Sequence, residues 1–220
     1  MRLIKFLLPV ISLIISMTAT AQVNQKKYDL FELNKDGKLR VFNRTLTSFM
    51  DKRGNGVKFS EASGDGVAWI DDLNFANGSI ELDIKGKDVL QQSFVGVAFH
   101  GVDEKTLDAV YFRPFNFHAT DSVRRIHAVQ YISHPEFPWN VLRETQNAKY
   151  EKAIPSAPAP NDWFHVKIVV DYPHITVFVN NSALPCLVVD KLNDRQAGKI
   201  GLWVGNSSGG EFANLVITNK

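Results

Sequence analysis

The sequence predicts a single-domain antiparallel β-sandwich of the jelly-roll type, preceded by a signal peptide. Short segments in which apolar and polar residues alternate recur along the chain. Gly, Asn, Asp and Pro separate these segments, as they do at turns between strands. Only residues 140–153 have the composition of a helix. Many short strands with little helix are typical of an all-β sandwich or barrel.

Residues 1–21 have the features of a secretory signal peptide. Arg2 and Lys5 precede an apolar run, and Ala19 and Ala21 supply the small residues that signal peptidase reads. A membrane anchor is the alternative, but the run is short for a span and Pro9 interrupts it. We therefore expect cleavage after Ala21, a mature domain of residues 22–220 without a membrane span, and a periplasmic or secreted location.

The charges of the mature domain are balanced. The chain has 25 basic and 23 acidic residues, and two of the basic ones, Arg2 and Lys5, leave with the signal peptide. No excess of one sign remains that would attract nucleic acid or an anionic membrane, so neither is expected as a partner. The single cysteine, Cys186, rules out an internal disulfide and is interpreted as a small buried apolar residue.

Alternation places the strands and their buried faces. Ile80, Leu82 and Ile84 alternate with charged residues, as in a half-buried strand, and the proline-rich residues 154–162 are interpreted as a loop. The predicted strands are 78–86, 93–101, 108–114, 127–133, two strands within 163–182, 199–205 and 211–219. The predicted core comprises Val95, Val97, Phe99, Val166, Ile168, Val170, Val177, Val179, Ile200 and Leu202.

Two positions need separate treatment. Phe212, Leu215 and Ile217 cannot share one face under strict alternation, so a β-bulge is expected near Asn214, with its side chain bonded to the freed backbone. Trp69 shares a face with Val67 and is assigned to the core.

The last third of the chain carries a resemblance to a known family. Trp163 opens a strand, a hairpin with an Asn tip follows, and then come a G-x-I-G-L strand and a closing F-x-N-L-x-I strand. Residues 163–217 resemble in this way the concanavalin A-like jelly-roll (laminin-G-like) superfamily, and most closely the 3-keto-disaccharide hydrolase-like domain family. The resemblance implies a sandwich fold and a function directed at carbohydrate.

Two upstream strands extend the resemblance and also depart from it. Residues 94–101 resemble the family's G-x-F-x-R-G strand, with His100 where arginine is usual. Residues 127–133 resemble the Y-E-V-Q-I-L-D strand, so that Gln130 matches the family's glutamine and Ala128 replaces its glutamate. Alanine cannot transfer a proton, which leaves open whether the protein is an enzyme.

Strand periodicity also predicts a ligand groove on one sheet. Gly96, Ala98 and His100 share one face of their strand, so a shallow floor would end in a histidine. Aromatic rings, planar amides and guanidinium groups are what sugars bind. The predicted ligand-binding residues are Tyr111, Arg113, Gln130 and Trp139, the last from the loop at 134–139. A solvated sheet face, or for the loop a buried aromatic corner, is the alternative.

Few side chains on the predicted strands can transfer a proton, and these are the candidates for catalysis. His100 and His127 are the predicted catalytic residues. The sequence predicts an exported carbohydrate-active protein that binds a glycan or glycoside. The more specific prediction is that it cleaves glycosidic bonds in a reaction like that of a keto-disaccharide hydrolase or lyase. The alternative is a non-catalytic carbohydrate-binding or adhesive laminin-G-like module.

No cofactor and no catalytic metal are predicted. His118, His127 and His134 lie close in sequence but do not have the spacing of a zinc site. Residues 34–38 begin like a calcium loop, but Thr45 stands where a bidentate glutamate is needed. Residues 63–66 are interpreted as a turn, and a structural calcium ion is left open.

Overall fold

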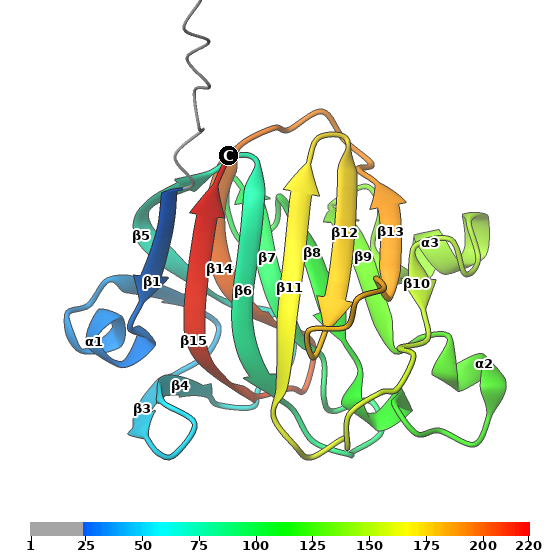
Figure 1. Cartoon of the computed structure of the whole chain (residues 1–220), viewed down its shortest axis with the longest axis horizontal. Coiled ribbons are helices and arrows are strands. Elements are labelled where there is room, and N and C mark those ends of the chain that lie inside the picture. The colour runs from blue at the N-terminus through cyan, green and yellow to red at the C-terminus, as the bar shows by residue number, and fades with distance from the viewer. Residues whose placement is uncertain (1–23) are drawn as a thin grey trace, which may run out of the picture.

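The computed structural model describes residues 24–220, which form two antiparallel β-sheets packed face to face (Figure 1). The predicted signal peptide and its cleavage site lie outside the described residues. The two-sheet architecture confirms the predicted antiparallel sandwich. None of the helices within residues 24–220 is both long enough and apolar enough to cross a membrane.

The eight-stranded sheet lies in front in Figure 1. Its strand order is β13-β12-β11-β6-β15-β4-β3, and β1 pairs with β15 beside this path. Its strands are β1 (Asn24–Tyr28), β3 (Leu46–Met50), β4 (Asn55–Phe59), β6 (Gly78–Lys85), β11 (Phe164–Asp171), β12 (His174–Val179), β13 (Leu187–Asp190) and β15 (Gly210–Asn219).

The seven-stranded sheet lies behind it, in the order β10-β9-β8-β7-β14-β5-β2. Its strands are β2 (Leu39–Phe42), β5 (Gly66–Phe75), β7 (Val95–Gly101), β8 (Leu107–Phe112), β9 (Val129–His134), β10 (Glu151–Lys152) and β14 (Gly198–Val204). The short helices are α1 (Leu30–Lys35), η1 (Pro114–Asn116), α2 (Ser122–Arg125) and α3 (Trp139–Thr145). The chain crosses between the sheets from β5 to β6 and returns from β6 to β7.

The core fills the space between the two sheets. All ten predicted core residues are buried, the most exposed of them, Val179, at 5%. Phe112 of the seven-stranded sheet packs against Phe164 of the eight-stranded sheet with ring centroids 5.2 Å apart. Apolar alternation therefore assigned the core correctly, because one face of each strand must be buried in a sandwich.

The predicted helix at 140–153 is only half correct. The helix α3 ends at Thr145, and Ala148 has a φ of 56°, which a helix does not accommodate. The chain then turns so that Glu151 pairs with Gln130 in the sheet. Pairing with the sheet edge here outweighs the helical propensity of the segment.

The predicted bulge at Asn214 is confirmed, but its side chain bonds a turn and a carboxylate instead of the backbone that the bulge frees. The register between β15 and β6 shifts between Ala213 and Val216, and Asn214 has a φ of 56°. Its side-chain Nδ2 donates to the carbonyl oxygen of Arg53 at 3.0 Å and to Oδ2 of Asp83 at 2.7 Å. The bulge lets Phe212, Leu215 and Ile217 all be buried, each at 1% exposure or less.

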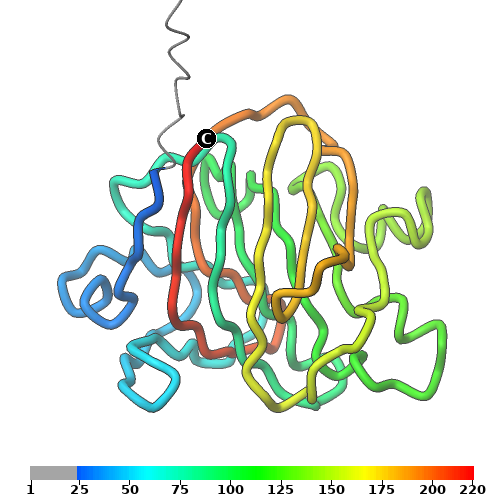
Figure 2. Tube along the Cα trace, viewed as in Figure 1, coloured from blue at the N-terminus to red at the C-terminus, as the bar shows by residue number. Residues whose placement is uncertain are grey.

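One buried carboxylate holds the connection from β13 to β14, the orange segment over the top of the molecule in Figure 2. Asp108 Oδ2 lies 2.6 Å from Lys191 Nζ, and both side chains are fully buried. Asp108 Oδ1 accepts hydrogen bonds from Tyr131 Oη at 2.5 Å and from Asn193 Nδ2 at 2.7 Å. The connection is thereby tied to β8 and β9 in the interior.

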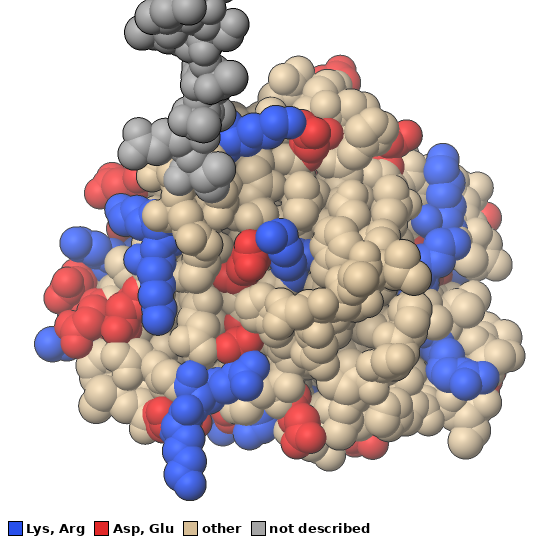
Figure 3. Space-filling model, viewed as in Figure 1, with Lys and Arg blue, Asp and Glu red and all other residues tan. Residues whose placement is uncertain are grey.

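Basic and acidic side chains are interspersed on the outer face of the eight-stranded sheet (Figure 3). Glu211 pairs with Lys58 and Lys85, and Lys167 pairs with Glu81. Over the part of this face that residues 24–220 present in the figure, no extended region carries one sign of charge.

Candidate functional site

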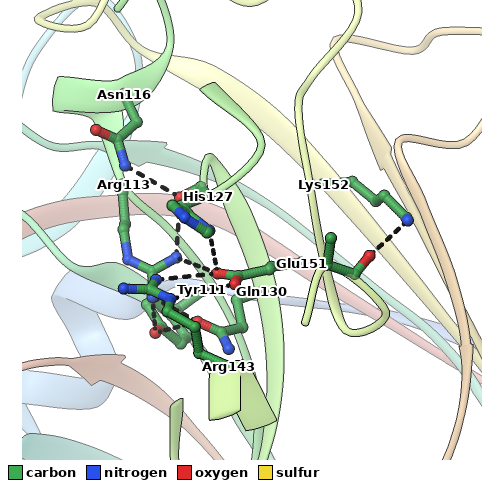
Figure 4. Close-up of polar contacts among 9 residues, drawn as sticks. Tyr111, Arg113, Asn116, His127, Gln130, Arg143, Glu151 and Lys152 are labelled. Carbon is green, nitrogen blue, oxygen red and sulfur yellow. Dashed lines mark hydrogen bonds and ion pairs between the residues drawn. The ribbon is translucent and has the colours of Figure 1, made fainter. Parts of the chain in front are cut away.

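A polar cluster lies on the outer face of the seven-stranded sheet, at its β8–β9–β10 edge (Figure 4). Tyr111 of β8 is directly opposite Gln130 of β9, which is opposite Glu151 of β10. Residues opposite one another in a sheet point to the same face, so these three side chains form one row. We call this group the Arg113 cluster; its members are Tyr111, Arg113, His127, Gln130, Arg143 and Glu151.

The guanidinium of Arg113 organises the row. Its Nη2 donates to Tyr111 Oη at 2.5 Å and also to Gln130 Oε1, and its Nη1 donates to the carbonyl oxygen of His127 at 2.9 Å. Tyr111 Oη in turn donates to Gln130 Oε1 at 2.8 Å. Two donors thus fix the amide oxygen of Gln130, while its Nε2 is buried without a hydrogen-bond partner.

Glu151 supplies the negative charge of the cluster. Its Oε2 lies 3.4 Å from Arg113 Nη1, 3.2 Å from Arg143 Nη2 and 2.7 Å from His127 Nδ1. The His127 contact is close, although the ring N–H is not aligned as a hydrogen bond. A carboxylate that is only 2% exposed needs such compensation, and two guanidinium groups provide it.

Burial sets the protonation states in the cluster. It raises the pKa of Tyr111 to about 12, against the opposing charge of Arg113, so the hydroxyl remains protonated and donates. Burial also lowers the pKa of His127, although Glu151 acts in the opposite direction. His127 is therefore neutral at neutral pH, and a neutral imidazole can accept a proton.

The cluster is buried, which differs from the open groove that the sequence predicted. Tyr111, Arg113 and Gln130 are exposed by 2%, 4% and 0%. The ring of Trp203 lies 5.1 Å from that of Tyr111, and the Arg113 guanidinium lies 5.8 Å from the ring centroid of Phe94. The bonds to Gln130 Oε1, to Tyr111 and to the His127 carbonyl compensate for the burial of Arg113, whereas Gln130 Nε2 remains without a partner.

Two further titratable groups, Asp65 and His134, interact electrostatically with each other, and Asp65 also interacts in this way with Tyr111 of the row. Asp65 precedes β5, and His134 ends β9 on the same face as Gln130. Burial raises the pKa of Asp65 and lowers that of His134, and the attraction between the two opposes both shifts. The charge of Asp65 also contributes to the raised pKa of Tyr111, so all three groups are within electrostatic reach.

Asp65 and His134 are half-buried, in contrast to the Arg113 cluster. Paired titratable groups with shifted pKa values are typical of sites that transfer protons. No sequence motif connects these two residues, because the fold alone brings them together from distant segments. The only signal was the crowding of polar and aromatic residues at 127–139.

His100 is not part of the cluster, which corrects the predicted shared face. Phe99 and His100 of β7 both lie opposite the single residue Ile200 of β14, and His100 has a φ of 48°. This bulge interrupts the alternation. The imidazole is fully buried beside Phe75, and its Nε2 lies 2.8 Å from the carbonyl oxygen of Ala76. Of the two histidines predicted to be catalytic, only His127 lies in the cluster.

Trp139 lies at the surface and reaches the cluster through one neighbour. It begins α3 and is 48% exposed, and the guanidinium of Arg143 lies 5.0 Å from its ring centroid. Arg143 then contacts Glu151. Phe137, the other aromatic residue of this loop, is half-buried, and its backbone pairs with that of Ser133. The loop therefore combines a packed corner with one exposed ring.

Within residues 24–220, no three His, Cys, Asp or Glu side chains are grouped as metal ligands would be. The calcium-like residues 34–38 form the end of α1 and a turn, with the backbone N–H of Asp36 donating to the carbonyl oxygen of Glu32 at 2.9 Å.

Comparison with known proteins identifies a family. A family model described as the 3-keto-alpha-glucoside-1,2-lyase-like domain matches residues 20–218. No curated protein matches the chain in sequence.

Solved structures share the fold at low sequence identity. A galectin-like protein of unknown function from Bacillus subtilis is 13% identical with a TM-score of 0.59, covering 90% of this chain and 98% of that one. The carbohydrate-binding module CBM66 from Bacillus subtilis is 12% identical with a TM-score of 0.54, covering 83% and 92%. Domain 4 of AbnA, an extracellular GH43 arabinanase from Geobacillus stearothermophilus solved with arabinotriose, is 17% identical with a TM-score of 0.53, covering 90% and 94%.

Proposed function

Because the chain belongs to the family of 3-keto-alpha-glucoside-1,2-lyase-like domains, we propose that it is an exported protein that binds a glycoside on the outer face of the seven-stranded sheet and cleaves the glycosidic bond of its 3-keto form. The observation that carries the proposal is the row of Tyr111, Gln130 and Glu151, with the titratable groups of Asp65 and His134 nearby. The likeness of the fold to CBM66 and to the arabinotriose-bound domain supports a carbohydrate ligand.

Gln130 is the proposed contact for the sugar. Its Nε2 is a donor held in place by the bonds to its own amide oxygen, and it has no acceptor in the protein. A buried donor without a partner costs about 1–3 kcal/mol, which an oxygen of the ligand would recover. A fixed donor is also suited to the negative charge that develops on a carbonyl oxygen during the reaction.

The proposed reaction is an elimination. In a 3-keto sugar the carbonyl group makes the hydrogen on C2 acidic. A base removes that proton, the C2–H electrons form a C1–C2 double bond, and the bond from C1 to the glycosidic oxygen breaks. An acid then protonates the departing oxygen. The products are an unsaturated keto sugar and the free alcohol.

His134 and Asp65 are the proposed base and acid. Burial lowers the pKa of His134, so the imidazole is neutral and can take the C2 proton. Burial raises the pKa of Asp65, so its carboxyl can hold the proton that the leaving oxygen needs. Glu151 brings a carboxylate to the row although position 128 is alanine, and there it holds Arg113 and Arg143 in place.

Turnover of p-nitrophenyl 3-keto-α-glucoside tests the proposal, since elimination releases p-nitrophenol. We expect His134→Gln to lower kcat on this substrate by about 100- to 10,000-fold, the usual contribution of a positioned acid or base. Asp65→Asn should cause a loss of this size with methyl 3-keto-α-glucoside, because methoxide must be protonated as it leaves, whereas p-nitrophenolate need not be. The control is His174→Gln, because His174 is exposed on the other sheet. Wild-type rates in both site variants would show that the two residues are not the acid and base.

The second candidate function is glycan binding without turnover, and the burial of the Arg113 cluster favours it. A reacting group must touch its substrate, whereas a buried network can simply support a binding surface. Binding on a glycan array, with no product from either the keto sugar or the parent glycoside, would establish this function in place of the lyase.

A further inference from the structure

A recess of about 450 Å³ lies at the opposite edge of the sheet that carries the Arg113 cluster. It is formed where β2, β5 and β14 lie side by side. The residues of its lining that matter here are Arg40, Trp69, Asp71, Asp72, Asn74 and Lys199. Trp69 is directly opposite both Arg40 and Gly201, which places its indole on the same outer face as Tyr111 and Trp203.

The backbone of β5 shapes this recess. Trp69 pairs with Gly201 and Asn74 pairs with Lys199, so four residues of β5 lie opposite the single residue Ile200 of β14. Asp72, within this bulge, has a φ of 58°. The extra chain length separates residues 70–73 from β14, while Ile70 still pairs with Leu39 of β2, and the displaced segment lines one side of the recess.

Two glycines leave room for the indole of Trp69. A Cβ at Gly101 would come within 2.3 Å of Trp69 Cη2, and one at Gly201 within 2.9 Å of Cε3. Distances this short exclude a side chain, so the ring lies directly on the neighbouring strands. The indole is 4% exposed, so only a small part of the ring reaches the base of the recess, with polar groups around it.

The polar groups of the recess carry no net charge. Arg40 Nη2 pairs with Asp71 Oδ1 at 2.8 Å, and Lys199 Nζ donates to the carbonyl oxygen of Val102 at 2.8 Å. With Asp72 there are two cations and two carboxylates, so neither an anion nor a cation is favoured. Donors, acceptors and an aromatic ring in a recess of this volume suit a neutral, hydroxyl-rich ligand, that is, a sugar residue.

We propose that this recess is a second sugar-binding subsite and that the ligand is an extended glycoside reaching from the Arg113 cluster to Trp69. The inference rests on the proposed function of the cluster. Three strand steps separate β8 from β5, which is roughly 14 Å at the spacing of strands in a sheet. The face between them carries the small residues Ala109, Ala98 and Gly201 in one row, so no long side chain stands in that row.

Binding as a function of ligand length tests the subsite. Isothermal titration calorimetry would use methyl α-glucoside and the malto-oligosaccharides up to maltohexaose, with a matched cello-oligosaccharide ladder. For the wild type we expect affinity to rise about tenfold or more from the single residue to the longer chains. The double variant Arg40→Ala/Asn74→Ala should lose that gain and bind methyl glucoside as the wild type does. Both positions are exposed, so the fold is retained.

A variant on the other sheet serves as the control. Lys58→Ala removes an exposed cation from β4 and should keep the full dependence on length. A third variant, Trp69→Phe, keeps an aromatic ring and should reduce the gain only in part.

The remaining outcomes separate the two proposals. If long chains bind no better than methyl glucoside, or if the double variant keeps the gain, the recess is not a subsite and the proposed function stands. If the double variant binds neither methyl glucoside nor the longer chains, the recess is the primary binding site. The proposal of a ligand that extends from the Arg113 cluster to the recess is then wrong. If neither ladder binds to the wild type, the subsite fails together with glucoside binding at the cluster.

Discussion

At the scale of single residues, buried charges decide which parts of the chain are held together. Asp108 ties the β13–β14 connection to the interior through Lys191, Tyr131 and Asn193. Glu151 does the same for α3 through Arg143. Each carboxylate has several partners, and removing it would leave cations buried without compensation. Removing one partner therefore lowers the free energy of unfolding by more than the intact pair contributes to it.

Asp108→Asn should lower the free energy of unfolding by about 3–5 kcal/mol, because Lys191 would keep a buried charge without its counter-ion. Urea denaturation followed by tryptophan fluorescence measures this loss. The control is Asp171→Asn, since the pair of Asp171 with Lys220 is more than half exposed and should contribute at most about 1 kcal/mol. Equal losses in the two variants would contradict the role given to burial.

At the scale of elements, bulges determine which face a side chain occupies. The bulge in β7 moves His100 away from the cluster, that in β5 builds the recess, and that in β15 buries Leu215. Each has a residue with positive φ, among them Asn214. A shift of one residue exchanges the two faces of a strand, so these positions control the site more than any change of strand length does.

Asn214→Ala should destabilise the protein by about 2–4 kcal/mol, since it loses two hydrogen bonds and puts alanine in the left-handed region, which asparagine tolerates better. Asn214→Gly loses the same bonds but adopts this conformation freely, so its loss should be smaller. Thermal unfolding of the two variants distinguishes these contributions. If the alanine variant is as stable as the glycine variant, the left-handed conformation is not required.

The strands also show which parts of the fold and of the site could be predicted from the sequence. Most strands from residue 78 onward were found at nearly their true bounds, because one buried face imposes a period of two. The strands β2 to β5 were not predicted, although β5 has buried apolar residues. The strand β1 was missed since four of its five residues are exposed, and β10 since its two residues follow a helix-like run. Arg113 and Gln130 were placed together correctly by alternation. Asp65 and His134 were not, because only the tertiary fold relates them.

At the scale of the whole molecule, two buried histidines, His100 and His127, and the half-buried His134 are held in their neutral form. Burial lowers the pKa of His100, His127 and His134. Below about pH 6.5 these three imidazoles bind protons in the unfolded chain but not in the folded protein. Stability is therefore complete above this pH and is lost as the pH falls toward the lower pKa values of the folded state. The raised pKa of Asp65 opposes part of the loss.

We expect the free energy of unfolding to be lower at pH 5.5 than at pH 7.5 for this reason. The variant His100→Gln should lose less on acidification than the wild type, because one buried imidazole has been removed. Urea denaturation at both pH values tests this. A wild type that is as stable or more stable at pH 5.5 would show that the histidines do not control the acid response.

The pairing of β1 with β15 affects how the chain reaches its folded state. Asn24 lies beside Asn219, and β15 also joins β6 to β4. The eight-stranded sheet cannot be completed before its last strand has been synthesised, and contacts so distant in sequence form slowly. A nascent chain remains without its final sheet until β15 has been synthesised. Such late folding is compatible with threading an extended polypeptide through a translocation channel, a route that early folding would block.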